Sequence, residues 1–271
     1  MSLPAIPSND TALYTNRLLG VMTMNVQAEK WFHRALQASE KGDIASAIRC
    51  YSQAIDRQSD YIAAYYNRAH EYELINNLQL AVSDYTRVIT LNPNDHEAWY
   101  NRGLCYRKMH QYDAAIRDYT RAIALDSKYK EAFHNRGNVY SLQGKYQQAI
   151  ADYTRTLDLA PDFYLACFNR AKAYDYLHDR NKAIEDYTLA IKLNPAFSQA
   201  YNNRGICFQQ TGQVEKAIQD FNRALNIDPD YKTAFANRVA ALHHRTAVAI
   251  NRKGRYYNYL LNKLQNRLYS A

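Results

Sequence analysis

The dipeptide Asn-Arg recurs along this 271-residue chain at intervals of 34 residues. A fixed period of this length constrains the fold more than composition does, because it is typical of chains that stack one small structural repeat many times. Each repeat buries its apolar face against its neighbours, which predicts one continuous stack instead of separate globular domains. The six copies are Asn67-Arg68, Asn101-Arg102, Asn135-Arg136, Asn169-Arg170, Asn203-Arg204 and Asn237-Arg238.

With the asparagine at the sixth place of a 34-residue frame, the chain divides into six complete repeats. Each contains two apolar-periodic segments joined by a short polar turn, and each ends in a helix-stop sequence such as LNPND. This pattern predicts two helices in every repeat. The predicted division is an N-terminal segment 1–27, partly disordered or a short helix; repeats 28–61, 62–95, 96–129, 130–163, 164–197 and 198–231; and residues 232–271, an incomplete seventh repeat with a basic amphipathic C-terminal helix.

Three places of the frame carry small or aromatic residues in every complete repeat. Place eight is Ala or Gly, place twenty is always Ala, and place twenty-four is Tyr or Phe. Small residues let helices approach closely, and rings fill the space between repeats. We therefore expect these places to form the core. At places twenty and twenty-four they are Ala47, Ala81, Ala115, Ala149, Ala183 and Ala217, with Tyr51, Tyr85, Tyr119, Tyr153, Tyr187 and Phe221.

This arrangement resembles the tetratricopeptide repeat family. The repeat at 130–163 has the family's large residue at place four, small residue at eight, Tyr at eleven, Gly at fifteen, Ala at twenty, aromatic at twenty-four and Pro at thirty-two. It departs only at Thr156, where the family has Ala. The resemblance covers about residues 28–244. It implies an all-α, right-handed superhelical solenoid of antiparallel helix pairs with a C-terminal capping helix, and a non-catalytic scaffold that binds proteins or peptides in a concave groove.

Arginine replaces the family's leucine at place seven of every repeat. An arginine on a packing face must find a partner, and the acid at place twenty-three is the candidate. We predict arginine–aspartate pairs within or between repeats, with anion binding by the arginines as the alternative. The predicted structural pairs draw on Arg68, Arg102, Arg136, Arg170 and Arg204, and on Asp84, Asp118, Asp152, Asp186 and Asp220.

Place six lies about 160° round the helix from place eight, on the side expected to face the groove. A carboxamide both donates and accepts, so a row of asparagines could hold a peptide backbone of any sequence. The row is similar to that in the repeat domain of O-GlcNAc transferase, which implies peptide binding; the alternative is inheritance by duplication, with only local amide bonds. The candidate peptide-binding residues are Asn67, Asn101, Asn135, Asn169, Asn203 and Asn237, with Tyr66, Tyr100, His134 and Phe168 from place five.

Chaperone-binding members of the family carry lysine at place five. No repeat here does, so binding to a chaperone C-terminal carboxylate is not expected. The net charge of +8 is concentrated in residues 232–271, which contain no Asp or Glu. An apolar stripe there predicts a capping helix, and its basic side could instead dock on nucleic acid, an anionic membrane or an acidic protein. The basic residues concerned are Arg252, Lys253, Arg255, Lys263 and Arg267.

The sequence offers no support for catalysis. It lacks the GxxxxGK, GxGxxG, HExxH and GxSxG motifs, and its four cysteines show no CxxC spacing. No run approaches the roughly 18 apolar residues that a membrane-spanning helix needs. We therefore expect a cytoplasmic protein that is not an enzyme, with no catalytic residues, metal site or cofactor. A regulatory subunit of an enzyme complex is a further alternative, and the oligomeric state is left open.

Overall fold

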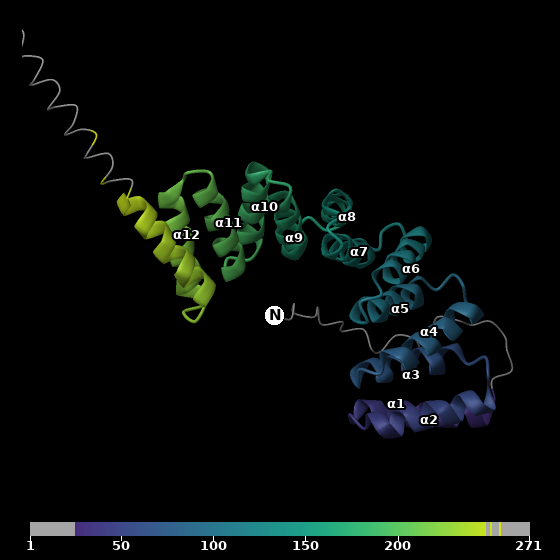
Figure 1. Cartoon of the computed structure of the whole chain (residues 1–271). Coiled ribbons are helices and arrows are strands. Elements are labelled where there is room, and N and C mark those ends of the chain that lie inside the picture. The colour runs from purple at the N-terminus through teal and green to yellow at the C-terminus, as the bar shows by residue number, and fades with distance from the viewer. Residues whose placement is uncertain (1–24, 248–249, 251–254, 256–271) are drawn as a thin grey trace, which may run out of the picture. The chain divides into compact units, whose positions relative to one another are not determined.

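The computed structural model describes residues 25–247, 250 and 255, and its secondary structure is helical (Figure 1). The predicted all-α fold of paired helices is confirmed in this part of the chain. A further helix occupies residues 232–247. The other helices are α1 (Val26–Glu40), α2 (Ile44–Arg57), α3 (Ile62–Leu74), α4 (Leu78–Leu91), α5 (His96–Lys108), α6 (Tyr112–Leu125), α7 (Lys130–Leu142), α8 (Tyr146–Leu159), α9 (Tyr164–Tyr176), α10 (Arg180–Leu193), α11 (Ser198–Gln210) and α12 (Val214–Ile227).

The chain forms two compact units, which meet in sequence between Val139 and Tyr140, inside α7. In the first unit, consecutive helices from α1 to α6 pack on one another. In the second, the same holds from α8 to α12. The predicted N-terminal segment lies outside the described residues up to residue 24, and so does most of the predicted C-terminal helix.

The core residues are those that the frame predicts. Every alanine at place twenty is fully buried, and the ring at place twenty-four is at most 1% exposed in all six repeats. Glycine at place eight allows the closest approach: a Cβ added to Gly103 would lie 2.8 Å from the Tyr119 ring, and one added to Gly205 would lie 2.7 Å from the Phe221 ring. The helices of a pair can therefore approach this closely only without a side chain at these positions.

The turn between the two helices of a repeat needs a left-handed residue at place fifteen. Gly144 fills this place with φ of 73°, at no steric cost. Two other repeats use a histidine there, His110 with φ of 59° and His178 with φ of 63°. A side chain in this region is strained, so these turns are formed at a cost that a glycine would avoid.

Candidate functional site

The arginine at place seven is held by the aspartate at place twenty-three of the same repeat. Arg102 donates from Nε to Asp118 Oδ2 at 2.7 Å and from Nη2 to Oδ1 at 2.9 Å. The same paired geometry joins Arg68 to Asp84, Arg170 to Asp186 and Arg204 to Asp220. The structure thus brings together four of the predicted pairs. The fifth, Arg136 and Asp152, has its members in different compact units.

A third contact of these arginines was not foreseen from the sequence. Arg102 Nη1 donates to the hydroxyl of Thr86, at place twenty-five of the preceding repeat, at 3.0 Å. The Thr86 hydroxyl donates in turn to the Val82 carbonyl at 2.7 Å, which leaves its oxygen free to accept. A hydroxyl recurs at this place, and this recurrence is the signal that could have revealed the contact. The hydroxyls that accept from an arginine are Ser52, Thr86, Thr120, Thr154 and Thr188.

Each of the four paired arginines therefore connects three helices and two successive repeats. In the pair of Arg102 with Asp118 the side chains are only 13% and 6% exposed. Burial lowers the pKa of the Arg102 guanidinium, but the hydrogen bond and charge of Asp118 raise this pKa further, so that it lies above its ordinary value. Each of the three nitrogens of Arg102 donates one hydrogen bond inside the chain, which favours a structural role for this arginine over the binding of an external anion.

The asparagines at place six donate to the preceding repeat. Asn101 Nδ2 donates to the Tyr66 hydroxyl at 2.5 Å, and Asn135 Nδ2 donates to the Tyr100 hydroxyl at 2.8 Å. Asn135 also donates to the Glu131 carbonyl at 3.1 Å, so both hydrogens of its amide are used. The local bonding that the sequence left as an alternative is therefore present.

The partner of the asparagine changes with the residue at place five. Where that residue is phenylalanine, the amide donates to the tyrosine of place twenty-four instead: hydrogen bonds from Asn67 and Asn203 oppose the rise in the pKa of Tyr51 and Tyr187 that burial causes. Asn237 donates to Asn202 Oδ1 at 2.9 Å. One end of the amide is thus fixed by the protein in each of these repeats.

The other end of the amide remains open in the first compact unit. The carbonyl oxygens of Asn101 and Asn135 accept no hydrogen bond from the described residues, and neither is a buried unpaired atom, so both face solvent. Fixing the nitrogen sets the rotamer and hence the direction of the oxygen. These two side chains are therefore oriented hydrogen-bond acceptors on the first helices α5 and α7.

Two of the four candidate residues at place five are buried, whereas the sequence predicts that they face the groove. His134 and Phe168 are each only 5% exposed, so the prediction that they offer rings to a ligand is wrong. The reason is packing across the repeat: the Phe168 ring lies 5.7 Å from the Tyr187 ring and 4.7 Å from the Phe197 ring. Tyr66 and Tyr100 are half-buried and take part through their hydroxyls.

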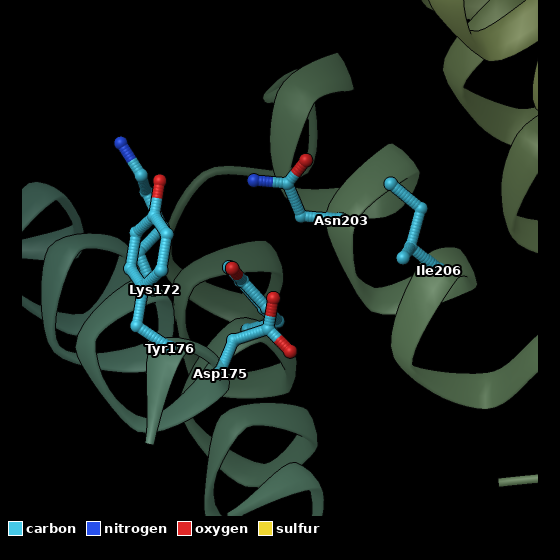
Figure 2. A pocket seen from close by; sticks show the side chains of 6 residues that line it. Lys172, Asp175, Tyr176, Asn203 and Ile206 are labelled. Carbon is cyan, nitrogen blue, oxygen red and sulfur yellow. The ribbon is translucent and has the colours of Figure 1, made fainter. Parts of the chain in front are cut away.

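A cavity of about 120 Å³ lies between α9, α10 and α11 in the second compact unit, with Tyr187 also in its wall. Figure 2 shows Asn203 and Ile206 facing Lys172, Asp175 and Tyr176 across it. Burial lowers the pKa of the half-buried Lys172 ammonium. The cavity therefore combines a charged side, an apolar side and one of the place-six asparagines.

The charges of this cavity are partly neutralised within the chain. Asp175 pairs with Arg180 and accepts from the Cys207 thiol at 3.4 Å. The Tyr176 ring is 58% exposed and stacks on the Tyr146 ring at 4.7 Å between centroids. The tyrosine pair gives the rim of the cavity a large, ordered apolar surface.

The predicted basic C-terminal site lies almost wholly outside the described residues. Of its members only Arg255 is described, and it is exposed. Elsewhere in the described part of the chain, no group of three His, Cys, Asp or Glu side chains is arranged to hold a metal ion. No helix of that part combines the length and apolar character needed to cross a bilayer.

Comparison with known proteins gives a consistent result. A tetratricopeptide repeat model matches residues 62–95, 96–129, 131–163 and 198–231, and a second model of this repeat matches 164–197. Among solved structures, a MamA protein is similar, with a TM-score of 0.60 and 24% identity over 62% of this chain and 92% of that one. No curated protein matches the chain.

Two further structures are similar at lower identity. YrrB, described as a TPR protein with an unusual peptide-binding site, is 20% identical, with a TM-score of 0.60 over 69% of this chain and 96% of its own. PilF of Pseudomonas aeruginosa is 15% identical, with a TM-score of 0.65 over 79% of this chain and 97% of its own. At these identities the likeness establishes the fold alone.

Proposed function

Because the chain belongs to the tetratricopeptide repeat family, whose members are protein-interaction scaffolds, we propose that it binds an extended peptide segment of a partner on its first helices. The ligand would lie along the face that carries place six. The protein would contribute no chemistry to the partner, only a surface that holds it in one conformation.

The oriented asparagine oxygens carry this proposal. Asn101 donates one hydrogen bond and Asn135 donates two hydrogen bonds inside the chain, and the oxygens of both amides are left in solvent. First helices of successive repeats lie roughly 9–10 Å apart, and an extended peptide advances about 3.3 Å per residue. One oxygen can then meet about every third peptide N–H, whatever the side chains of the peptide are.

Within the second compact unit, the cavity beside Asn203 offers a separate point of side-chain selection. Its volume of about 120 Å³ is well above the roughly 10–15 Å³ that a single water molecule requires. Ile206 offers an apolar wall, while Lys172 and Asp175 offer polar groups. A peptide side chain with an apolar stem and a polar end would satisfy both sides of this cavity.

The expected affinity is modest. A hydrogen bond contributes only about 0.5–1.5 kcal/mol net, because the peptide gives up bonds to water when it binds. Ordering a flexible peptide opposes binding further. Backbone recognition should therefore give broad specificity for the sequence of the peptide.

The proposal can be tested by selecting binders from a random peptide library displayed on phage and measuring the affinity of synthetic versions by fluorescence anisotropy. The joint replacement Asn101→Ala and Asn135→Ala should weaken binding about tenfold, since two acceptors are lost. Ile206→Glu should weaken the binding of peptides whose side chains fill the cavity. Circular dichroism must first show that each variant is folded.

Two control variants separate binding from structure. Tyr100→Phe removes the anchor of Asn135 but keeps its oxygen, so it should cost less affinity than Asn135→Ala. Asn181→Ala changes an exposed asparagine on the second helix α10 and should have no effect. Failure to enrich any peptide, or equal affinity in the alanine variant, would contradict the proposal.

Three further predictions are kept as alternatives. Nucleic acid, an anionic membrane or an acidic protein could bind the basic C-terminal residues, and a steep fall of nucleic-acid affinity with salt would support that function. A regulatory role in an enzyme complex and a cytoplasmic location are likewise predictions from the sequence. Peptide binding on the first helices requires none of these three.

A further inference from the structure

The seventh repeat continues as a helix at the point where the other six repeats turn. In each complete repeat the chain reverses at place fifteen through a residue with positive φ, between 56° and 77°. The equivalent residue, Thr246, is helical, and its hydroxyl donates to the Leu242 carbonyl at 3.0 Å. A β-branched side chain is strained in the left-handed region that this turn needs. The helix at 232–247 therefore runs past the point where a second helix of its own repeat would begin.

This helix, which ends the second compact unit, is covered on one side only (Figure 1). Its Ala241 is fully buried in a cluster with residues of α12. By contrast, Phe235 at place four is 53% exposed, whereas Tyr201, at the same place of the preceding repeat, is 9% exposed. In the second repeat, the place-four residue Tyr65 packs in one cluster with Val88 of the second helix. The exposed side of the 232–247 helix is therefore the side that a second helix would cover.

The arginine of this helix lacks the partner that its equivalents have. In four repeats the arginine at place seven donates from Nε and Nη2 to the two oxygens of an aspartate. Arg238 keeps only their third contact, from Nη1 to Asn222 Oδ1 at 3.3 Å. Its Nε and Nη2 make no hydrogen bond with the described residues, and Asp220 of α12 is occupied by Arg204. The two open nitrogens are thus the two that hold a carboxylate elsewhere.

The following residues of the chain do not supply this carboxylate. Place twenty-three of the seventh repeat is Gly254, and residues 232–271 contain neither Asp nor Glu. Asn251 and Arg255 stand at places twenty and twenty-four, where the complete repeats have alanine and an aromatic ring. Two copies of the protein that met through this face would bring one Arg238 against another, which like-charge repulsion disfavours. Charge complementarity therefore favours an acidic helix of a different protein.

We propose that the exposed face of the 232–247 helix binds an acidic helix of a partner protein, which takes the place of the missing second helix. Its aspartate would accept from Arg238 Nε and Nη2 in the paired geometry of the other repeats. Arg238 lies 5.2 Å from the centroid of the Phe235 ring, so the cation and the exposed ring form one surface. A helix that carries both an acid and apolar residues would cover both groups.

The complete repeats define the sequence that this helix must carry. Their second helices have alanine at place twenty and, in five of the six, aspartate three residues later. The residue after the aspartate must be smaller than the ring of these repeats, because Val239 stands where they have Ala or Gly. Even a Cβ added to Gly205, at the same place, would lie 2.7 Å from the Phe221 ring. This site shares no residue with the asparagine oxygens of α5 and α7, so it does not depend on peptide binding there.

The first test uses a synthetic helix as the probe. It has the sequence of α12 with leucine in place of Phe221, which retains the required alanine and aspartate. Isolated helices of this length are marginal in water, so a lactam bridge holds the probe helical, as circular dichroism must show. Titration of the full chain should shift the Arg238 Nε–H signal in ¹⁵N NMR spectra saturably, and not that of Arg204, which Asp220 occupies. No saturable shift at Arg238 would overturn the site.

The second test measures affinity by fluorescence anisotropy of the labelled probe. Changing the aspartate of the probe to asparagine should weaken binding about tenfold, and so should Arg238→Met in the protein. Both changes together should cost little more than either one, because they remove the same contact. Arg245→Met removes an equal charge from an exposed position of the same helix and should leave the affinity unchanged. Equal losses in the two arginine variants would indicate unspecific attraction to a basic helix and contradict the proposed pairing.

Two further outcomes bear on the occupant and its register. The leucine probe should bind more tightly than one that keeps an aromatic ring after the aspartate; the reverse order would overturn the register that Val239 imposes. Sedimentation velocity compares the natural protein with Phe235→Ser. A dimer that this variant dissociates would show that a second copy covers the face, and the acidic partner would then be wrong.

Discussion

In the repeats where an aspartate pairs with it, the arginine at place seven should be one of the largest single contributors to stability. Consider Asp118→Leu, which removes the acid but leaves Arg102 in place. The guanidinium would keep its bond to Thr86 and lose both bonds to the carboxylate. An uncompensated charge would then remain where the side chain is only 13% exposed.

The magnitude follows from this burial. Breaking a buried ion pair by removing one partner costs about 3–5 kcal/mol. Arg102 keeps some access to water and lies 4.8 Å from the centroid of the Trp99 ring, which partly offsets the loss. We therefore expect about 3 kcal/mol, at the lower end of this range. Replacing both residues, as in Arg102→Met with Asp118→Leu, should cost much less, because no charge remains buried.

Urea unfolding measures these free energies. The chain has two tryptophans, so a Trp31→Phe background makes Trp99 fluorescence a local probe of this repeat. Far-UV circular dichroism reports the whole chain in the same samples. The four variants form a double-mutant cycle with an expected coupling of about 2–3 kcal/mol.

A matched control comes from an exposed pair. Asp158 lies 3.9 Å from Arg155, with more than half of its side chain exposed. Asp158→Ala should change the free energy of unfolding by only about 0–1 kcal/mol. If Asp118→Leu costs no more than this control, or the coupling is below about 0.5 kcal/mol, the assigned role of the arginine is wrong.

Four other substitutions test the fold and its pH dependence. His110→Gly should raise the free energy of unfolding by about 0.5–1 kcal/mol, because a side chain in the left-handed region is strained. Gly144→Ala should lower this free energy by about as much, and urea midpoints measure both changes. Gly103→Ala should cost about 1–3 kcal/mol, because its Cβ would lie 2.8 Å from the Tyr119 ring; an unchanged midpoint would contradict this packing. Folding lowers the pKa of His134 from 6.5 to about 4. The neutral imidazole therefore contributes its full share to the free energy of unfolding above pH 6.5, and this share is lost as the pH falls toward 4. From pH 7 to pH 5 the natural protein should therefore lose about 2 kcal/mol more than His134→Phe, by comparison of their unfolding free energies.

The repeated frame explains how much of the fold is predictable from the sequence. Each place must occupy the same environment in every repeat, so six copies of Ala at place twenty identify a buried contact with little ambiguity. The pairing of Arg102 with Asp118 is predictable for a related reason: a charge on a packing face requires a partner, and one acid recurs at a suitable place.

The details of the site are less accessible because they depend on contacts between repeats. A helical wheel places His134 on an outward face, but it omits the neighbouring helices that cover the side chain. The wheel likewise cannot show that Asn101 reaches Tyr66, which lies 35 residues earlier in the chain. The hydroxyl of Thr86 was visible in the sequence, but threonine on a helix is too common to reveal an arginine contact alone.

The central claim is that a peptide binds along the first helices through the oxygens of the asparagines. The most direct measurement is the ¹⁵N NMR response of the asparagine side-chain amides to a selected peptide. The account predicts that the signals of Asn101 and Asn135 shift upon binding, while that of Asn181 on the second helix α10 does not. Shifts confined to second helices, with Asn101 and Asn135 unchanged, would contradict it.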